Sequence, residues 1–180
     1  ISVEPSRAAD LCEKLLSDSG EAKPKLAGLG ARDALRIEAG LCLYGNDIDE
    51  TTSPVEAALT FVVAKSRRQP GAFPGAEKII SQIKNKNPPR KRIGLICEKG
   101  RPPRAGATVH DPESGTQVGT VTSGCPSPNL KQNVAHAYVE PKYAKKGTSV
   151  SVNVTGKEGQ FVGATVAKMP FVTAHYYTGK

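Results

Sequence analysis

Apolar positions in the first half of the chain recur with the period of an α-helix. Ser6 can cap the first of these helices. Its apolar face would consist of Ala8, Leu11, Cys12, Leu15 and Leu16. A second short helix is predicted over residues 34–39, ending at Gly40. The capping box Ser53-Pro-Val-Glu56 predicts a third helix, and the apolar stripe within residues 75–83 predicts a fourth.

The pattern changes to that of β-strands near residue 90. Residues 84–92 are polar and basic and contain two prolines, which is typical of a domain linker. Six strand-like runs separated by turn residues follow, at 92–97, 107–110, 117–123, 133–139, 149–154 and 160–167. Short strands spaced in this way predict a small β-barrel or sandwich. The whole pattern therefore predicts an α+β protein.

Length and composition fit a folded protein of one domain or two small ones. The chain has 180 residues, of which 38% are hydrophobic and 23% are charged. No window approaches the ~18 consecutive apolar residues of a transmembrane helix, so no membrane partner is expected. The first residue is Ile1 rather than Met, so we expect a processed or incomplete chain.

Positive charge is concentrated in the second half of the chain. The net charge is +8, and residues 91–180 hold 12 Lys and Arg against 5 Asp and Glu. The basic run at residues 84–92 could bind nucleic acid, but it contains no aromatic side chain on which a base could stack. We therefore expect no nucleic-acid partner and interpret this run as a solvated linker.

Residue types that often carry catalysis or bind metals are scattered. The cysteines are Cys12, Cys42, Cys97 and Cys125. They form no C-x-x-C pair, and the apolar surroundings of Cys12 and Cys97 predict buried, inert thiols. The histidines stand alone and are expected to be structural or exposed; they are His110, His136 and His175. Hence no metal site is predicted, and no cysteine or histidine is singled out as catalytic.

An acidic segment follows the second predicted helix. Tyr44-Gly-Asn-Asp-Ile-Asp-Glu50 contains three carboxylates but not the twelve-residue pattern of a calcium-binding EF-hand loop. We therefore expect Asp47, Asp49 and Glu50 to lie in a solvated loop.

Arg32 is the candidate binding residue. It follows a Gly-x-Gly turn at a predicted helix start, where backbone N–H groups also point outward. Such a place suits an anion such as a carboxylate. The alternative is a surface ion pair with Asp33 or Glu38, and spacing alone favours this alternative.

Three longer stretches resemble a known family. They are residues 28–50, the string Gly119-Thr-Val-Thr-Ser-Gly-Cys-Pro-Ser-Pro128, and the string Lys168-Met-Pro-Phe-Val172. Together with the ending Tyr176-Tyr177, they resemble the T-protein of the glycine cleavage system, an aminomethyltransferase. The ending is more similar to eukaryotic, mitochondrial members than to bacterial ones. The resemblance covers only the C-terminal half of that enzyme.

The resemblance implies a fold and a domain boundary. Residues 1–88 would be the C-terminal portion of the folate-binding α/β domain. Residues 89–180 would be a small antiparallel β-barrel of jelly-roll type. The change of pattern near residues 84–92 falls at the same place.

The resemblance also implies a function. The family transfers a one-carbon unit from the aminomethyl-dihydrolipoyl arm of lipoylated H-protein to tetrahydrofolate and releases ammonia. Two family substrate contacts correspond to Arg32 and Tyr176, whereas the catalytic Asp corresponds to no residue of this chain. We therefore expect folate binding here but no activity from these 180 residues alone. The expected location is the mitochondrial matrix if the protein is eukaryotic, and otherwise the cytoplasm.

Two other functions remain open at this point. The chain could be a non-catalytic basic β-barrel module that docks an acidic carrier protein. It could also be the C-terminal folate region of an enzyme similar to dimethylglycine or sarcosine dehydrogenase.

Overall fold

The structure is a computed structural model in two compact units. It describes residues 1–17, 20–22, 24–69, 71–157 and 159–175. The units comprise residues 1–32 and residues 33–180, and each is described by itself. Among the described residues, no helix is long and apolar enough to span a membrane.

The first unit contains short helices with an open apolar face. They are η1 (Pro5–Arg7), α1 (Ala8–Ser17), η2 (Gly20–Ala22) and the start of α2 (Leu29–Glu38). The helix predicted behind Ser6 is confirmed, but none of the residues of α1 is buried. Cys12 is exposed, so the prediction of a buried thiol there is wrong. The apolar residues of α1 have the spacing of one helix face, but helical spacing alone does not determine whether that face is buried.

Helix α2 is longer than its sequence pattern predicted. It begins at Leu29 rather than at residue 34, because Gly30 and Ala31 continue the helical backbone. The Arg32 N–H donates to the Gly28 carbonyl at 3.2 Å. The helix ends at Glu38, one residue before the predicted end, and Gly40 follows with a φ of 72°, which is easily reached only without a side chain.

The capping box forms a single turn instead of the predicted helix. The Glu56 N–H donates to Ser53 Oγ at 3.1 Å, as a cap requires. However, Ala58 takes a left-handed φ of 58°, which stops the helix after one turn. Next come η3 (Thr60–Val62), α3 (Lys65–Arg68) and the predicted helix α4 (Ala76–Asn85).

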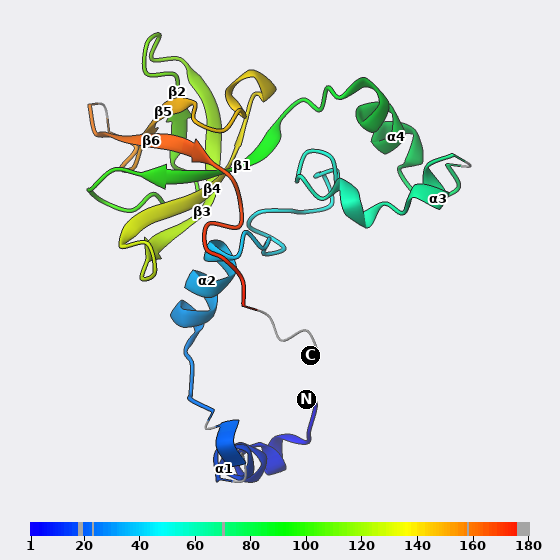
Figure 1. The fold of residues 1–180 in the computed structure, drawn as a ribbon, viewed down its shortest axis with the longest axis vertical. Helices are drawn as coiled ribbons and strands as arrows, with labels where there is room; N and C mark the ends of the chain where they lie inside the picture. The colour runs from blue at the N-terminus through cyan, green and yellow to red at the C-terminus, as the bar shows by residue number, and fades with distance from the viewer. Residues whose placement is uncertain (18–19, 23, 70, 158, 176–180) are drawn as a thin grey trace. The chain divides into compact units, whose positions relative to one another are not determined.

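Six strands among the described residues form a closed antiparallel barrel (Figure 1). They are β1 (Lys91–Cys97), β2 (Thr108–His110), β3 (Gln117–Ser127), β4 (Gln132–Val139), β5 (Ser149–Asn153) and β6 (Phe161–Ala167). The order around the barrel is β1-β4-β3-β2-β5-β6, so β1 pairs with β6 and closes it. A short 3-10 helix, η4 (Pro141–Tyr143), links β4 to β5.

Alternate residues of the strands build the barrel core. Leu95, Val109 and Val152 are fully buried, and every strand adds at least one apolar side chain to this core. This alternation of core-facing residues is the pattern from which the strands were predicted, although β1 and β4 bury residues of their other face as well. Strand β3 runs four residues further than predicted, since its second half still pairs with β4 as far as Ser127 and Gln132. The α+β class and the antiparallel barrel are therefore confirmed.

A buried carboxylate joins the capping-box turn to the chain entering the barrel. Glu56 accepts from Arg90 Nε at 2.8 Å and from Gln82 Nε2 at 3.3 Å. The backbone N–H of Arg92 donates to the Glu56 carbonyl at 2.7 Å, and the buried Arg92 guanidinium donates to the Ala57 carbonyl. The segment predicted to be a solvated linker is thus ordered at its end, where β1 already begins at Lys91.

Candidate functional site

Arg32 lies on α2, one turn before Arg36, and its side chain is exposed. The two acids that could have paired with it have other partners. Asp33 Oδ1 accepts from Arg36 Nε at 2.8 Å, and Glu38 bonds to the barrel. The guanidinium of Arg32 is thus presented to solvent on a helix. Tyr176, the other predicted contact, lies outside the described residues.

The C-terminal end of α2 is attached to the barrel by Arg36. Its Nη1 donates to Asp47 Oδ2, and its Nη2 donates to Ser123 Oγ at 2.9 Å. Asp47 also accepts from Thr122 Oγ1 at 2.5 Å and from the Leu43 N–H at 2.9 Å. The acidic segment is therefore fixed against β3 at this point, instead of forming a solvated loop throughout.

Asp47 is only 2% exposed, and its environment keeps the carboxylate ionised. Burial by itself would raise its pKa. The neighbouring His136 ring, the Thr122 hydroxyl and the Leu43 amide outweigh that effect and hold the pKa of Asp47 well below its usual range. The prediction of a solvated loop is therefore wrong for Asp47, but it is confirmed for Asp49 and Glu50, which are exposed.

His136 is fully buried and lies against Phe171 of the segment that follows β6. Its Nε2–H donates to the Ile37 carbonyl at 3.1 Å, and its Nδ1 lies 3.6 Å from Asp47 Oδ1. The Phe171 ring stacks on it with 6.0 Å between ring centroids. The prediction of a structural or exposed histidine is confirmed here and for His175, which is exposed.

Glu38 connects α2 to the β3–β4 turn. Its carboxylate is 2% exposed and accepts from Ser127 Oγ and from Asn129 Nδ2, the latter at 2.6 Å. Burial raises the pKa of Glu38, but these hydrogen bonds reverse the shift, so the pKa is lowered overall. Ser127 belongs to the string at residues 119–128 and is the last residue of β3, so this part of the string attaches α2 to the barrel.

The segment after β6, residues 168–171, returns to the same end of α2 and is called the strap. The Phe171 N–H donates to the Glu38 carbonyl at 2.8 Å. Figure 1 shows the strap running from β6 past β1 to α2. A side chain at Gly94 would come within 2.7 Å of the Phe171 ring, and one at Gly40 within 2.8 Å of Met169 Cβ. The two glycines therefore provide the space in which the strap lies.

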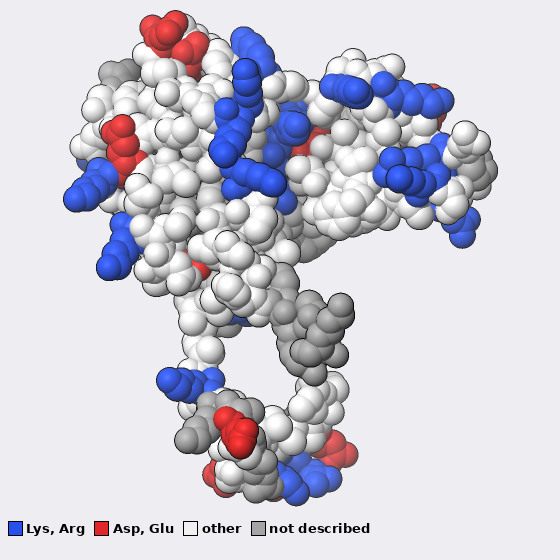
Figure 2. All heavy atoms as spheres, in the orientation of Figure 1, with Lys and Arg blue, Asp and Glu red and all other residues white. Residues whose placement is uncertain are grey.

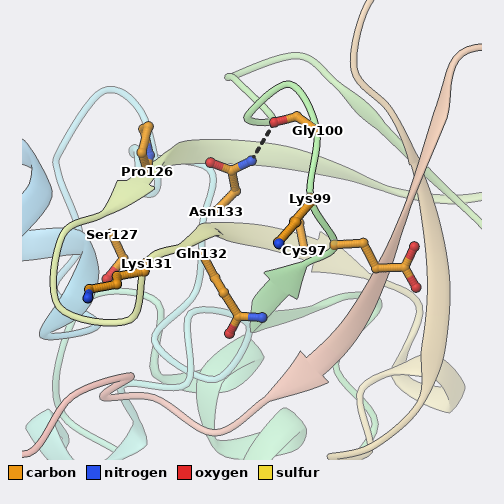
Figure 3. Close-up of a pocket in the computed structure, with 9 residues that line it drawn as sticks. Cys97, Lys99, Gly100, Pro126, Ser127, Lys131, Gln132 and Asn133 are labelled. Atoms are coloured by element: carbon orange, nitrogen blue, oxygen red, sulfur yellow. Dashed lines mark hydrogen bonds between the residues drawn. The ribbon is translucent and has the colours of Figure 1, made fainter.

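Several open hollows are lined by residues of the second unit, among them two that adjoin strand β1. One, of about 360 Å³, lies between β1 and the β3–β4 turn and is bordered by Lys99, Lys131 and Asn133 (Figure 3). The Asn133 Nδ2 donates there to the Gly100 carbonyl at 2.9 Å. Burial raises the pKa of the adjoining Cys97 thiol to about 12, so this cysteine is inert as predicted. The other, of about 480 Å³, lies beside the strap and includes Arg92 and Met169.

Among the described residues, no cluster of three or more His, Cys, Asp or Glu side chains is arranged so that it could bind a metal ion. The polar clusters that do occur are the hydrogen-bonded carboxylates described above. Sequence reasoning missed Asp47 and Glu38, because their partners are far away in the chain. The only signal in the sequence is that β3 contains hydroxyl side chains, among them Thr122 and Ser127, which can donate hydrogen bonds to carboxylates.

The chain matches two family profiles in succession. Residues 1–67 match the GCVT N-terminal domain, and residues 90–173 match the glycine cleavage T-protein C-terminal barrel domain. The chain belongs to the glycine cleavage T-protein family. The expected family relationship is thereby confirmed.

Curated relatives and a solved structure agree with this assignment. All 180 residues align with "Aminomethyltransferase, mitochondrial" of Gallus gallus at 53% identity and with that of Homo sapiens at 51%. A crystal structure of the glycine cleavage system aminomethyltransferase T from Bartonella henselae is similar, with 42% identity and a TM-score of 0.81 over 93% of this chain. The chain spans under half the length of these relatives, 44%, 42% and 44% respectively.

Proposed function

We propose that residues 1–180 belong to a tetrahydrofolate-dependent aminomethyltransferase of the glycine cleavage system. The observation that carries this proposal is the identity of 53% with an aminomethyltransferase over every residue of the chain. The aligned region is the whole chain, so it includes α2, the β3 string and the strap. The relatives cited above are named aminomethyltransferases, which favours this function over a dehydrogenase-like enzyme.

The proposed partners are lipoylated H-protein and tetrahydrofolate. H-protein would deliver the aminomethyl group on its dihydrolipoyl arm, and tetrahydrofolate would accept the one-carbon unit as ammonia leaves. We place the enzyme in the mitochondrial matrix, because the animal relatives carry "mitochondrial" in their names. We further propose that residues 1–88 complete the folate-binding domain and that residues 89–180 form the barrel domain.

Arg32 and Tyr176 are proposed as substrate-binding residues. A guanidinium on an exposed helix can bind a carboxylate of the folate or brace an acidic group of the site. A tyrosine offers a ring for packing and a hydroxyl for one hydrogen bond. The roles proposed for them are orientation and electrostatic stabilisation of the one-carbon transfer.

Substitution of Arg32 tests the binding role. In the full-length enzyme, Arg32→Ala should lower kcat/KM for tetrahydrofolate at least about tenfold, since a charge-assisted hydrogen bond contributes about 1.5–3 kcal/mol. The melting temperature should change little, because the side chain is exposed. The matched control is Arg67→Ala, which removes an exposed arginine from α3. An unchanged kcat/KM in Arg32→Ala would exclude the binding role.

The 180 residues by themselves should not catalyse the transfer. The family's catalytic Asp has no counterpart among them, so binding residues would lack the group that drives the chemistry. The measurement is one-carbon transfer from aminomethylated H-protein to tetrahydrofolate, with the full-length enzyme as the positive control. Turnover by the 180 residues at a rate near that of the full-length enzyme would contradict the proposed division of roles.

A further inference from the structure

We propose that Asp47 is a positioning residue that acts through Arg36 on the helix carrying Arg32. This inference rests on the substrate-binding role proposed for Arg32. Asp47 itself is buried and touches no substrate in this role. Its effect would be to fix the direction in which α2 presents the guanidinium.

Arg36 holds α2 in one orientation because three side chains accept hydrogen bonds from its guanidinium, in addition to the Leu41 carbonyl at 3.4 Å. Nε donates to Asp33 on the helix itself, Nη1 to Asp47, and Nη2 to Ser123 on β3. A planar guanidinium with several acceptors fixes both a distance and a rotation. Arg32 and Arg36 are four residues apart, so they share one side of the helix, about 6 Å apart along its axis.

Asp47 is in turn held from two directions, which makes it a rigid acceptor. The Leu43 N–H and the Thr122 hydroxyl bind its carboxylate, from its own loop and from β3 respectively. The Tyr138 hydroxyl on β4 donates to the Asp47 backbone carbonyl at 2.8 Å. Neither the carboxylate nor the backbone of this residue can turn without breaking a buried hydrogen bond.

The contacts described for α2 come from its last turns. Besides Arg36, the Ile37 carbonyl accepts from His136, and Glu38 accepts from the β3–β4 turn. A helix fixed near one end transmits a small rotation there to the side chains of the preceding turn. Loosening the Asp47–Arg36 pair should therefore displace Arg32, although no atom of Arg32 is altered.

Glu56 provides a matched control for a purely structural effect. Like Asp47, it is 2% exposed, pairs with an arginine and has a lowered pKa, although burial alone would raise it. Its partners are Arg90, Gln82 and Lys78, none of which belongs to α2. Glu56→Gln should thus cost stability in a similar way without moving Arg32.

The decisive experiment is a double-mutant cycle in the full-length enzyme. Asp47→Asn and Glu56→Gln are each made with Arg32 intact and in the Arg32→Ala background, and kcat and KM are measured for both substrates. Asp47→Asn should raise the KM for tetrahydrofolate about fivefold or more and leave the KM for H-protein unchanged. With Arg32→Ala already present, Asp47→Asn should have no further effect on that KM. Equal effects in both backgrounds would overturn the proposal.

A second variant and a second measurement cover the other outcomes. If Asp47→Asn does not fold, Thr122→Val removes one hydrogen bond from Asp47 and should give a smaller effect of the same kind. Hydrogen exchange of the α2 amides needs no activity: Asp47→Asn or Thr122→Val should speed it, and Glu56→Gln should not. An inactive wild-type enzyme would contradict the proposed function, whereas equal exchange in all variants would contradict the positioning role alone.

Discussion

Three buried carboxylates attach segments outside the barrel either to strand β3 or to the chain that enters β1. Glu38, Asp47 and Glu56 each belong to a loop or helix outside the barrel, and each is nearly inaccessible to water. Burying an unpaired charge is costly, so their many donors are necessary for the fold. For all three, hydrogen bonds overcome the effect of burial and the pKa is lowered.

The lowered pKa values predict a loss of stability in acid. A carboxyl group whose folded pKa lies below its unfolded value, about 4, stabilises the protein above that value. This stability is lost as the pH falls through the unfolded and then the folded pKa. The free energy of unfolding, measured with urea, should therefore fall steeply below about pH 4.5. Glu38→Gln and Glu56→Gln should be less stable than wild type at pH 7 and lose less on acidification. Exposed Glu77→Gln is the control, and it should follow the wild-type curve.

At the scale of elements, the strap and β1 fit together because one residue lacks a side chain. Gly94 lies on β1 where the Phe171 ring and Met169 cross the strand. On α2, by contrast, Gly30 has open space around it and an ordinary helical backbone. The same substitution at these two glycines should have opposite effects.

Gly94→Ala should destabilise the protein by about 1–3 kcal/mol, because the strap or the strand must move away. Gly30→Ala should stabilise it by up to about 1 kcal/mol, because alanine favours the helix and glycine does not. Urea unfolding of both variants beside wild type measures the difference. Equal changes in both would mean that the strap does not pack on β1 as described.

Local patterns predicted the elements of this fold but not its polar contacts. All six strands were predicted, because the alternation of apolar and polar residues along a strand is a local pattern of the sequence. The helix behind Ser53 was predicted wrongly, because Ala58 turns left-handed and nothing in the capping box encodes that. Asp47 was expected in solvent, because its donors Arg36, Thr122 and Tyr138 come from three separate segments. The role of Arg32 came from resemblance and not from spacing.

At the scale of the whole chain, charge distinguishes the barrel half from the rest. Figure 2 shows Lys and Arg gathered across one face of the barrel, with Asp and Glu in separate spots. The candidates for binding an acidic partner are Lys142, within η4, and Lys145 and Lys146, which follow it. Lys142 pairs with Glu140 at 3.2 Å and lies over the Tyr143 ring, whereas Lys145 and Lys146 are exposed. The latter two are thus the better candidates for meeting the proposed carrier protein.

Reversing these two charges tests that surface. Lys145→Glu with Lys146→Glu should raise the apparent KM for H-protein and leave the KM for tetrahydrofolate unchanged, because opposite charges mainly speed association. The difference should shrink above about 0.15 M salt, where the screening length falls to about 8 Å. The control is the charge reversal of Lys99 and Lys131, which border the hollow between β1 and the β3–β4 turn. An unchanged KM for H-protein at low salt would mean that Lys145 and Lys146 only keep the barrel soluble.

The hydrogen bond between Phe171 and Glu38 has a consequence for the order of folding. All six strands lie between these residues in the chain, but β1 and β6 are neighbours in the closed barrel. Before the barrel closes, the strap can reach α2 only by closing a very long loop, and such non-local contacts form slowly. Afterwards, the strap emerges beside β1 and has only a short way to go. During synthesis, α2 leaves the ribosome before any strand of the barrel, but the strap can contact it only after the last strand has formed.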